Sequence, residues 1–396
     1  MNGRHRGEMG TRYSPKEMIA RLVSFDTVSR NSNLALIEFV EDYLDGWGVP
    51  HSRVENEDGS KANLLATLGP ADRPGGIVLS GHTDVVPVDG QDWTTDPFTL
   101  READGKLFAR GTCDMKSFFA IALALVPDFL ARDMQVPIHF ALSYDEEIGC
   151  LGVRPLIDQA IRHLPRPEVV IVGEPTDMLV VNAHKSINAF RTKIRGLEAH
   201  SSATHEGVNA VMIAAELIHF ISQIADDMKA KGDPTGRFTP PFTSVHVGTI
   251  QGGTALNIIP KDCAFQWEFR SLPGQEPDEI VGRVNEFAET VLLPKMRAIY
   301  PDAAIETRPG AHVPPLMPED GSPGETLVLK LAEQNSTEAV SYGTEAGLFQ
   351  LADIPTVICG PGSILQAHKP DEFVTLAQVD ACVRFMTRLI DHVHTA

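Results

Sequence analysis

The sequence predicts an α/β protein with a central mixed, largely parallel sheet and a smaller, inserted α+β (ferredoxin-like) domain. Short apolar runs typical of buried strands alternate with helical patterns over the first 185 residues, and again near the C-terminus. Between these parts the elements follow a different order. The chain of 396 residues is also longer than one hydrophobic core usually organises, which favours more than one domain.

The first elements of the main domain follow from capping residues and apolar spacing. Ser14 precedes Pro15, and Glu17 lies three positions after Ser14, which is the pattern of a capping box at a helix start. A second helical pattern follows and stops at Gly48. Beyond it, buried strands are predicted at 76–81, 138–143 and 169–172, and helices at 118–130 and 153–164.

Residues 186–293 are predicted to form the inserted domain. We therefore expect the main domain to comprise residues 1–185 and 294–396, with the C-terminal part completing its sheet. The proline- and glycine-rich stretch 309–324 is predicted to be a loop. Inside the insert, strands are expected at 188–194, 244–250 and 263–269 and helices at 209–228 and 277–292; after it, elements are expected at 325–334, 344–352, 356–359 and 375–395.

Composition and charge restrict the classes of partner. The chain is 43% hydrophobic, with 32 glycines and 28 prolines, as in an ordinary folded protein. Its net charge of −19 argues against nucleic acid, because phosphate backbones need a basic surface. No run of about eighteen apolar residues and no signal-peptide pattern occurs, so we expect no membrane association and a cytoplasmic location. The five cysteines include no Cys-x-x-Cys pair, which argues against a disulfide framework.

Several segments that could bind a metal directly follow predicted strands, at the sheet edge where α/β proteins build their sites. His82 leaves a buried strand, and Asp84 is placed to orient its imidazole, although a lone histidine is more often structural. Asp114 lies in a glycine-containing turn before a helix, where it also fits an N-cap. Glu146 and Glu147 belong to a row of three carboxylates, which either a metal or solvent would stabilise.

The order of these residues is more informative than any one of them. With Glu174 after a further strand and His368 near the C-terminus, the set resembles the signature of the zinc-dependent deacylase and peptidase family. That family includes acetylornithine deacetylases, succinyl-diaminopimelate desuccinylases, aminoacylases and glutamate carboxypeptidases. The resemblance extends from about Ser14 to the C-terminus. Segments 342–346 and 360–372 look most like the acetylornithine deacetylase branch.

The resemblance implies two zinc ions bridged by Asp114, with cobalt as a possible substitute. Histidine nitrogen and carboxylate oxygen are suitable zinc ligands. The resemblance also implies that Glu146 is the general base, which takes a proton from water and delivers it to the leaving amine. It further implies a cis peptide bond between Asp114 and Met115. The implied ligands are His82 and Glu174 for one ion, and Glu147 and His368 for the other.

In the inserted domain, three residues match lid positions of the family. His200 is implied to stabilise the oxyanion, from its own or a partner subunit, while a histidine that caps a helix is the alternative. Asn257 and Arg270 match positions that hold a substrate carboxylate, although Arg270 also fits a structural ion pair. Family members mostly pair lid to lid, so the resemblance implies a homodimer formed through residues 186–293.

The implied function is hydrolysis of a small N-acyl amino acid. For the acetylornithine deacetylase branch this is removal of the acetyl group from N-acetylornithine, a step of arginine biosynthesis. Desuccinylase, aminoacylase and carboxypeptidase activities stay open, because these enzymes share the same catalytic residues. A non-catalytic relative that only binds ligands is the alternative from another class, but such proteins usually lose a ligand or the base. The complete set of five ligands and a base favours an enzyme.

Overall fold

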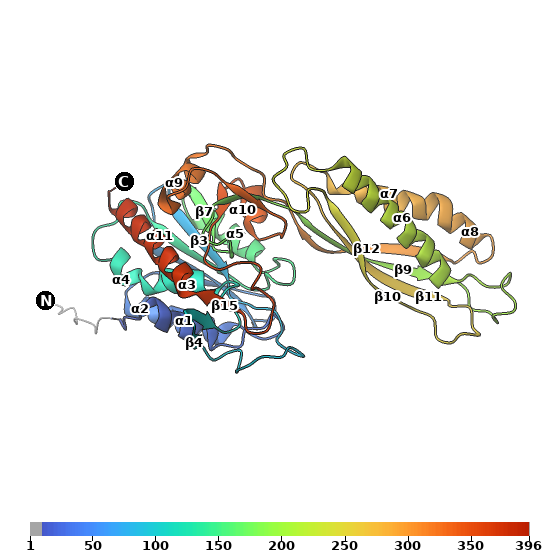
Figure 1. Ribbon diagram of the computed structural model, residues 1–396, viewed down its shortest axis with the longest axis horizontal. Coiled ribbons are helices and arrows are strands. Elements are labelled where there is room, and N and C mark those ends of the chain that lie inside the picture. The colour runs from blue at the N-terminus through green and yellow to red at the C-terminus, as the bar shows by residue number, and fades with distance from the viewer. Residues whose placement is uncertain (1–9, 396) are drawn as a thin grey trace. The chain divides into compact units, whose positions relative to one another are not determined.

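The computed structural model describes residues 10–395, which form two compact units (Figure 1). The second unit comprises Ala183–Met317 and Ala339–Gly343, and the first comprises the described remainder of the chain. The predicted end of the insert at residue 293 is wrong. The following strand pairs with the sheet of the second unit, so this unit continues to Met317.

An eight-stranded mixed sheet forms the centre of the first unit, as the sequence predicts. Its central strands run parallel to one another, and antiparallel strands flank them on both sides. In spatial order the strands are β1 (His51–Glu55), β2 (Ala62–Leu68), β6 (Ile138–Ser143), β3 (Ile77–His82), β7 (Val169–Val172), β14 (Thr356–Ile358), β8 (Val181–His184) and β13 (Glu338–Val340).

Helices cover both faces of this sheet (Figure 1). The helices are α1 (Pro15–Val23), α2 (Leu34–Gly46), α3 (Lys116–Ala124), α4 (Val126–Phe129), α5 (Val153–His163), α9 (Pro323–Ala332), α10 (Ala346–Leu351) and α11 (Leu376–Thr395). On one face α2, α3, α9 and α11 enclose the main apolar core, and α1 packs on α3; on the other face lie α5 and α10.

The predicted helix 118–130 is divided after Ala124, and Pro127, which cannot donate a backbone hydrogen bond, lies in the second piece. No helix within residues 10–395 is both long and apolar enough to cross a membrane.

Local signals at the N-terminus of the first unit act as predicted. The Ser14 side chain accepts a hydrogen bond from the Glu17 backbone, and the Glu17 carboxylate accepts one from the Ser14 backbone. This capping box begins α1 at Pro15. A small three-stranded sheet, which the sequence analysis missed, contains β15 (Phe373–Thr375), β5 (Lys106–Phe108) and β4 (Arg101–Ala103) in spatial order.

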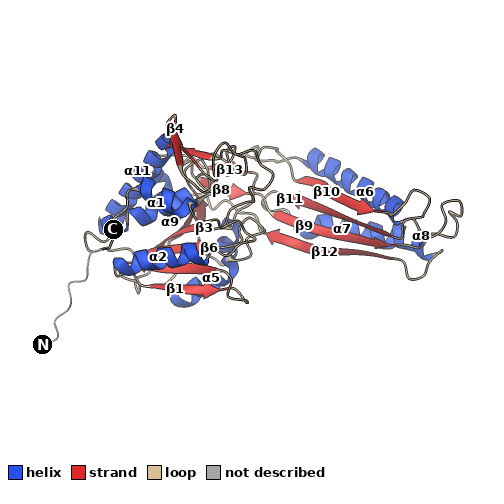
Figure 2. Cartoon of the chain, turned by 90° about the horizontal axis from the view of Figure 1, so that it is seen from below, coloured by secondary structure: helices blue, strands red, loops and turns tan. Residues whose placement is uncertain are grey.

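The second unit is an antiparallel sheet with helices on one face (Figure 2). Its predicted strands and long helix are present. The stretch predicted as a loop from residue 309 is wrong at its start, because Pro309 pairs with Phe190 in an edge strand that has a register shift before His312. Edge strands tolerate proline at such positions. The elements are β10 (Ser244–Gly252), β11 (Asp262–Arg270), β9 (Ile187–Arg195) and β12 (Ala304–Val313) in spatial order, with α6 (Ala210–Lys231), α7 (Pro277–Phe287), the π-helical η1 (Ala288–Leu292) and α8 (Leu293–Arg297).

Candidate metal centre and active site

Parallel strand ends bring three of the predicted segments together. His82 is the last residue of β3, which pairs in parallel with β6 on one side and β7 on the other. Glu146 and Glu147 follow β6, and Glu174 follows β7. Because parallel strands end at the same edge of a sheet, these side chains meet there.

The small three-stranded sheet adds the two remaining predicted ligands. Asp114 lies between β5 and α3, and His368 lies in the loop before β15. Since β5 and β15 pair antiparallel, the two loops are neighbours. The peptide bond between Asp114 and Met115 is cis, which confirms the prediction.

The five predicted ligands divide into two groups that share Asp114. One oxygen of Asp114, Oδ1, lies 3.1 Å from His82 Nε2, and that nitrogen is 3.7 Å from Glu174 Oε1. The other oxygen, Oδ2, lies 3.2 Å from His368 Nε2, which is also 3.2 Å from Glu147 Oε2. The carboxylate of Asp114 therefore offers one oxygen to each group.

Glu146 lies beside this arrangement, and its geometry is compatible with two roles. Its carboxylate comes within 4.8 Å of ligand atoms of His82 and Glu174, so it could contribute a ligand atom. It also accepts a hydrogen bond from the Cys150 thiol, with 3.2 Å between Sγ and Oε1. Cys150 was given no role from the sequence, because a lone cysteine near an acidic run carries no specific signal.

Asp84 supports both the imidazole and the acidic loop. The Nδ1 atom of His82 lies 2.9 Å from the backbone oxygen of Asp84 and 3.6 Å from its carboxylate. The same carboxylate accepts hydrogen bonds from the backbone N–H groups of Glu146 at 3.1 Å and Glu147 at 3.3 Å, and from the Ser29 hydroxyl at 2.7 Å. Asp84 therefore holds the backbone of the Glu146–Glu147 loop as well as contacting His82.

The electrostatics of the cluster fit a cation. Burial raises the pKa of Glu146 to about 8 and the pKa of Glu174 well above its usual range. The Oε1 atom of Glu147 is buried and has no hydrogen-bond partner among the described residues. Within the same part of the chain, no lysine or arginine forms an ion pair with Asp114 or these glutamates. A donor set of four carboxylates and two imidazoles suits divalent metal ions.

The two histidines provide the opposing charge. Hydrogen bonds to Asp114 and Glu147 raise the pKa of His368 to about 10, although its side chain is 52% exposed. Burial opposes the charged form of His82, but hydrogen bonds to Asp114 and Asp84 raise its pKa well above the usual range. A metal ion would replace these protons, because histidine binds metals through its neutral form.

His200 and Asn257 lie on the second unit, in adjacent loops. The backbone N–H of Ser201 donates to the backbone oxygen of Asn257 at 3.1 Å, and His200 forms an isolated bridge with Ile258. His200 is exposed, and its Nδ1 lies 2.8 Å from the Ser202 hydroxyl oxygen. Helix α6 is capped by Asn209, so His200 is not a helix cap there.

Arg270, also on the second unit, forms the structural ion pair that the sequence analysis left open. Its Nε and Nη2 atoms each lie 3.3 Å from a carboxylate oxygen of Glu268. His246 Nε2 lies 3.2 Å from the same carboxylate. Arg270 thus has a partner, and a substrate carboxylate would have to compete with it.

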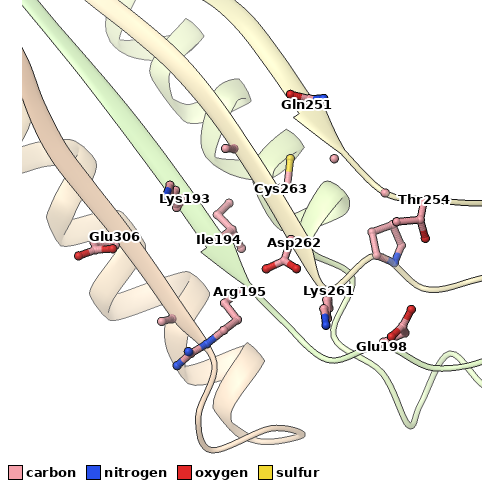
Figure 3. A pocket seen from close by; sticks show the side chains of 15 residues that line it. Lys193, Ile194, Arg195, Glu198, Gln251, Thr254, Lys261, Asp262, Cys263 and Glu306 are labelled. Carbon is pink, nitrogen blue, oxygen red and sulfur yellow. The ribbon is translucent and has the colours of Figure 1, made fainter.

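A cavity of about 860 Å³ lies on the second unit, beside the sheet strands (Figure 3). Its charged residues are of both signs, and the metal-binding groupings found among residues 10–395 all belong to the first unit. This cavity therefore lacks the reactive cluster that hydrolysis needs. Its charged residues are Lys193, Arg195, Lys261, Glu198, Asp262 and Glu306.

A buried acid near the cluster, Glu345, was given no role from the sequence. Glu345 is fully buried, and its two oxygens accept hydrogen bonds from Ser80 Oγ at 2.6 Å and Ser143 Oγ at 2.8 Å. These serines lie on the strands that lead to His82 and Glu146. Glu345 lies in segment 342–346, which the family resemblance singled out, but that segment does not identify the partners of Glu345.

Comparison with known proteins agrees with this arrangement. Residues 78–392 match the family described as peptidase family M20/M25/M40. An acetylornithine deacetylase of Myxococcus xanthus is 33% identical over 388 residues, which cover 94% of this chain and 96% of the relative. An acetylornithine deacetylase of Proteus mirabilis is 35% identical over 369 residues, covering 93% of this chain and 92% of the relative.

The fold has solved counterparts. An M20 family metallo-carboxypeptidase from Sulfolobus solfataricus superposes with a TM-score of 0.75 and 16% identity, covering 96% of this chain and 99% of that protein. The match confirms the predicted fold class, and the family match confirms the predicted family. The chain therefore belongs to peptidase family M20/M25/M40 and is a metal-dependent hydrolase.

Proposed function

We propose that this protein is a di-zinc amidohydrolase that removes the acetyl group from N-acetylornithine, giving ornithine and acetate. The observation that carries the proposal is the division of the site into two ligand groups that share the two oxygens of Asp114. The choice of substrate rests on the two acetylornithine deacetylases, which resemble this chain over almost its whole length.

In this proposal Asp114 would contribute a ligand to both ions. His82 and Glu174 would help to hold one ion, and Glu147 and His368 the other. Two zinc ions, or cobalt ions in their place, would lower the pKa of a water molecule and polarise the amide carbonyl. The orphan buried oxygen of Glu147 and the charge of the cluster support this assignment.

Glu146 acts as the general base. Its burial favours proton uptake, as the pKa of about 8 indicates, and its carboxylate lies within 4.8 Å of ligand atoms of His82 and Glu174. Glu146 takes a proton from the attacking water, whose hydroxide adds to the acetyl carbon. When the C–N bond breaks, Glu146 returns that proton to the amine nitrogen, so that acetate and the free amino group of ornithine result.

The second unit supplies the substrate contacts and the assembly surface. His200 donates a hydrogen bond to the oxyanion, from its own or a partner subunit, and the second unit serves as lid and as interface of a homodimer. Asn257 and Arg270 hold the substrate carboxylate, for which Arg270 must leave Glu268. The substrate is a small molecule, and we expect the enzyme to act in the cytoplasm.

The test is a panel of substrates assayed with added zinc or cobalt. It contains N-acetylornithine, N-acetylmethionine, N-succinyl-diaminopimelate and a dipeptide. We expect the highest kcat/KM with N-acetylornithine. Preference for the succinyl compound or the dipeptide would favour the desuccinylase or carboxypeptidase activity. A protein that binds both metal ions and turns over no member of the panel would favour a non-catalytic relative.

Two variants test the assigned roles. Glu146→Gln should keep two zinc ions and lose about 10²–10⁴-fold in kcat, because a general base typically contributes that factor. A loss of zinc in this variant would instead make Glu146 a ligand. His200→Ala should lower kcat with both zinc ions retained, and light scattering of the wild-type protein tests the homodimer.

A further inference from the structure

Glu372 holds the loop that carries Asp114. It lies four positions after His368 and is 1% exposed. Its Oε1 atom accepts hydrogen bonds from three backbone N–H groups, those of Gly111 at 3.0 Å, Cys113 at 2.8 Å and Asp114 at 3.1 Å. One buried carboxylate oxygen thus fixes the backbone on both sides of the turn before Asp114.

The second oxygen of Glu372 connects this loop back to His368. Arg110 Nη1 donates to Oε2 at 2.5 Å, and Arg110 is 1% exposed. Arg110 Nη2 donates to Gln91 Oε1 at 2.7 Å, and Gln91 Nε2 donates to the backbone oxygen of His368 at 2.9 Å. The guanidinium group also lies 5.1 Å from the ring centre of Trp93, which limits its movement. Three consecutive hydrogen bonds thus connect Glu372 through Arg110 and Gln91 to the backbone of His368.

The turn itself could not satisfy these donors. Gly111 has a φ of 84°, and the N–H groups of Gly111, Cys113 and Asp114 converge on a single point. Converging backbone N–H groups form an anion-binding nest. Without the carboxylate, each buried N–H would lose its acceptor, at a cost of about 1–3 kcal/mol. The direction in which Asp114 presents its carboxylate therefore depends on Glu372.

We propose that Glu372 is a positioning residue of the metal centre, which sets the orientation of Asp114 and ties it to His368. This inference rests on the proposed two-metal site. Glu372 contacts neither substrate nor metal in this role. The ion held by Asp114, Glu147 and His368 depends on Glu372 through two of its ligands, whereas the ion held by His82 and Glu174 depends on it only through Asp114. Loss of Glu372 should weaken the two ions unequally.

The test compares Glu372→Gln with Glu325→Gln. The amide of the first variant keeps one acceptor but presents an NH₂ group either to the three backbone donors or to Arg110. Glu325 is a matched control, because it is 6% exposed, lies in the same unit and accepts hydrogen bonds from Gly321 N at 2.9 Å and Asn182 Nδ2 at 2.7 Å. Neither partner belongs to the metal cluster.

Zinc is titrated calorimetrically into chelator-stripped wild-type and variant proteins, and thermal unfolding of the stripped proteins is recorded. For Glu372→Gln we expect one zinc to bind with near wild-type affinity and the other about 10–100-fold more weakly, the usual effect of losing an outer partner. Glu325→Gln should bind both as the wild type does. Wild-type affinities for both ions in Glu372→Gln would overturn the proposal. It would also be overturned if both ions lost affinity equally and Glu325→Gln showed the same loss as Glu372→Gln.

If stripped Glu372→Gln lacks a cooperative unfolding transition, Arg110→Lys decides the question. Lysine keeps a positive charge but cannot contact Glu372 and Gln91 together. The zinc that binds more weakly in Glu372→Gln should therefore also bind more weakly in Arg110→Lys, by a smaller factor than in Glu372→Gln. Unchanged affinity for that zinc would overturn the proposal. A wild-type protein that binds fewer than two zinc ions would overturn the proposed centre itself. Failure to hydrolyse N-acetylornithine would leave the zinc comparison valid.

Discussion

Replacing Asp84 by asparagine tests how the acidic loop is held against the histidine. The Asp84 carboxylate accepts hydrogen bonds from the backbone of Glu146 and Glu147 and lies 3.6 Å from His82 Nδ1. An amide of the same shape keeps one acceptor oxygen but turns the other into a donor. At least one of the two loop N–H groups then faces a donor. The backbone contact from Asp84 to His82 remains.

The expected magnitude follows from these contacts. A hydrogen bond to a charged acceptor contributes about 1.5–3 kcal/mol, and 1.4 kcal/mol corresponds to about tenfold in an equilibrium constant. One lost bond therefore predicts a decrease of about 10–100-fold in zinc affinity. Both ions should be affected, because His82 and Glu147 belong to different ligand groups. Turnover at saturating zinc should also fall, since Glu146 moves with the loop.

The assay is a zinc titration of the chelator-stripped Asp84→Asn protein, followed by kcat and KM at saturating zinc. Ser29→Ala is the control: it removes the hydroxyl that donates to Asp84 at 2.7 Å and leaves both loop contacts in place. We expect this control to lose less zinc affinity than Asp84→Asn, because the carboxylate and its two bonds to the loop backbone remain. Wild-type zinc affinities and wild-type kcat in Asp84→Asn would refute the reasoning.

Three further predictions address the metal, the base and stability. Chelation should abolish hydrolysis, and activity should return with added zinc or cobalt until two equivalents are bound; full activity at one equivalent would contradict a two-metal site. Cys150→Ala should lower kcat several-fold without loss of zinc, whereas Cys150→Ser, which keeps a donor for Glu146, should stay closer to wild type; equal rates would contradict an orienting contact. Burial lowers the pKa of His139 to about 4, so below about pH 6.5 this residue binds more protons in the unfolded chain than in the folded one. The contribution of His139 to the free energy of unfolding should therefore fall by about 2.5 kcal/mol between pH 8 and pH 4.5. Urea unfolding of wild type and His139→Gln at both pH values measures this, and an identical pH dependence in the variant would contradict it.

Elements with local signals were predicted well. The predicted strands at 138–143 and 169–172 have the bounds of β6 (Ile138–Ser143) and β7 (Val169–Val172), because continuous apolar runs mark strands buried on both faces. Strand β12 (Ala304–Val313) was missed: no strand was predicted there, and Pro309 and Gly310 give a turn-like composition. Its stability comes from pairing with β9, which lies far earlier in the chain. Such pairing leaves no local pattern.

In the candidate site, too, residues in sequence motifs were predicted, and residues whose partners are distant in the chain were not. The order of motifs predicted the ligand residues, and the structure places all five of them in one cluster, although their roles stay predictions. The residues behind the cluster could not be found in this way. Glu345 meets serines of two earlier strands, and Glu372 meets a turn more than 250 residues before it. Only the folded chain brings these partners together.

The position of β14 (Thr356–Ile358) between β7 and β8 (Val181–His184) has a consequence during synthesis on the ribosome. Strand β7 is complete at Val172, but its neighbour on that side is made more than 180 residues later. At about 5–20 residues per second this takes roughly 10 to 40 s. Over that time the apolar edge of β7 stays unpaired, and such edges promote aggregation. Most of the second unit, the continuous segment Ala183–Met317, is made within this interval, and the sheet of the first unit can be completed only after translation has passed Ile358.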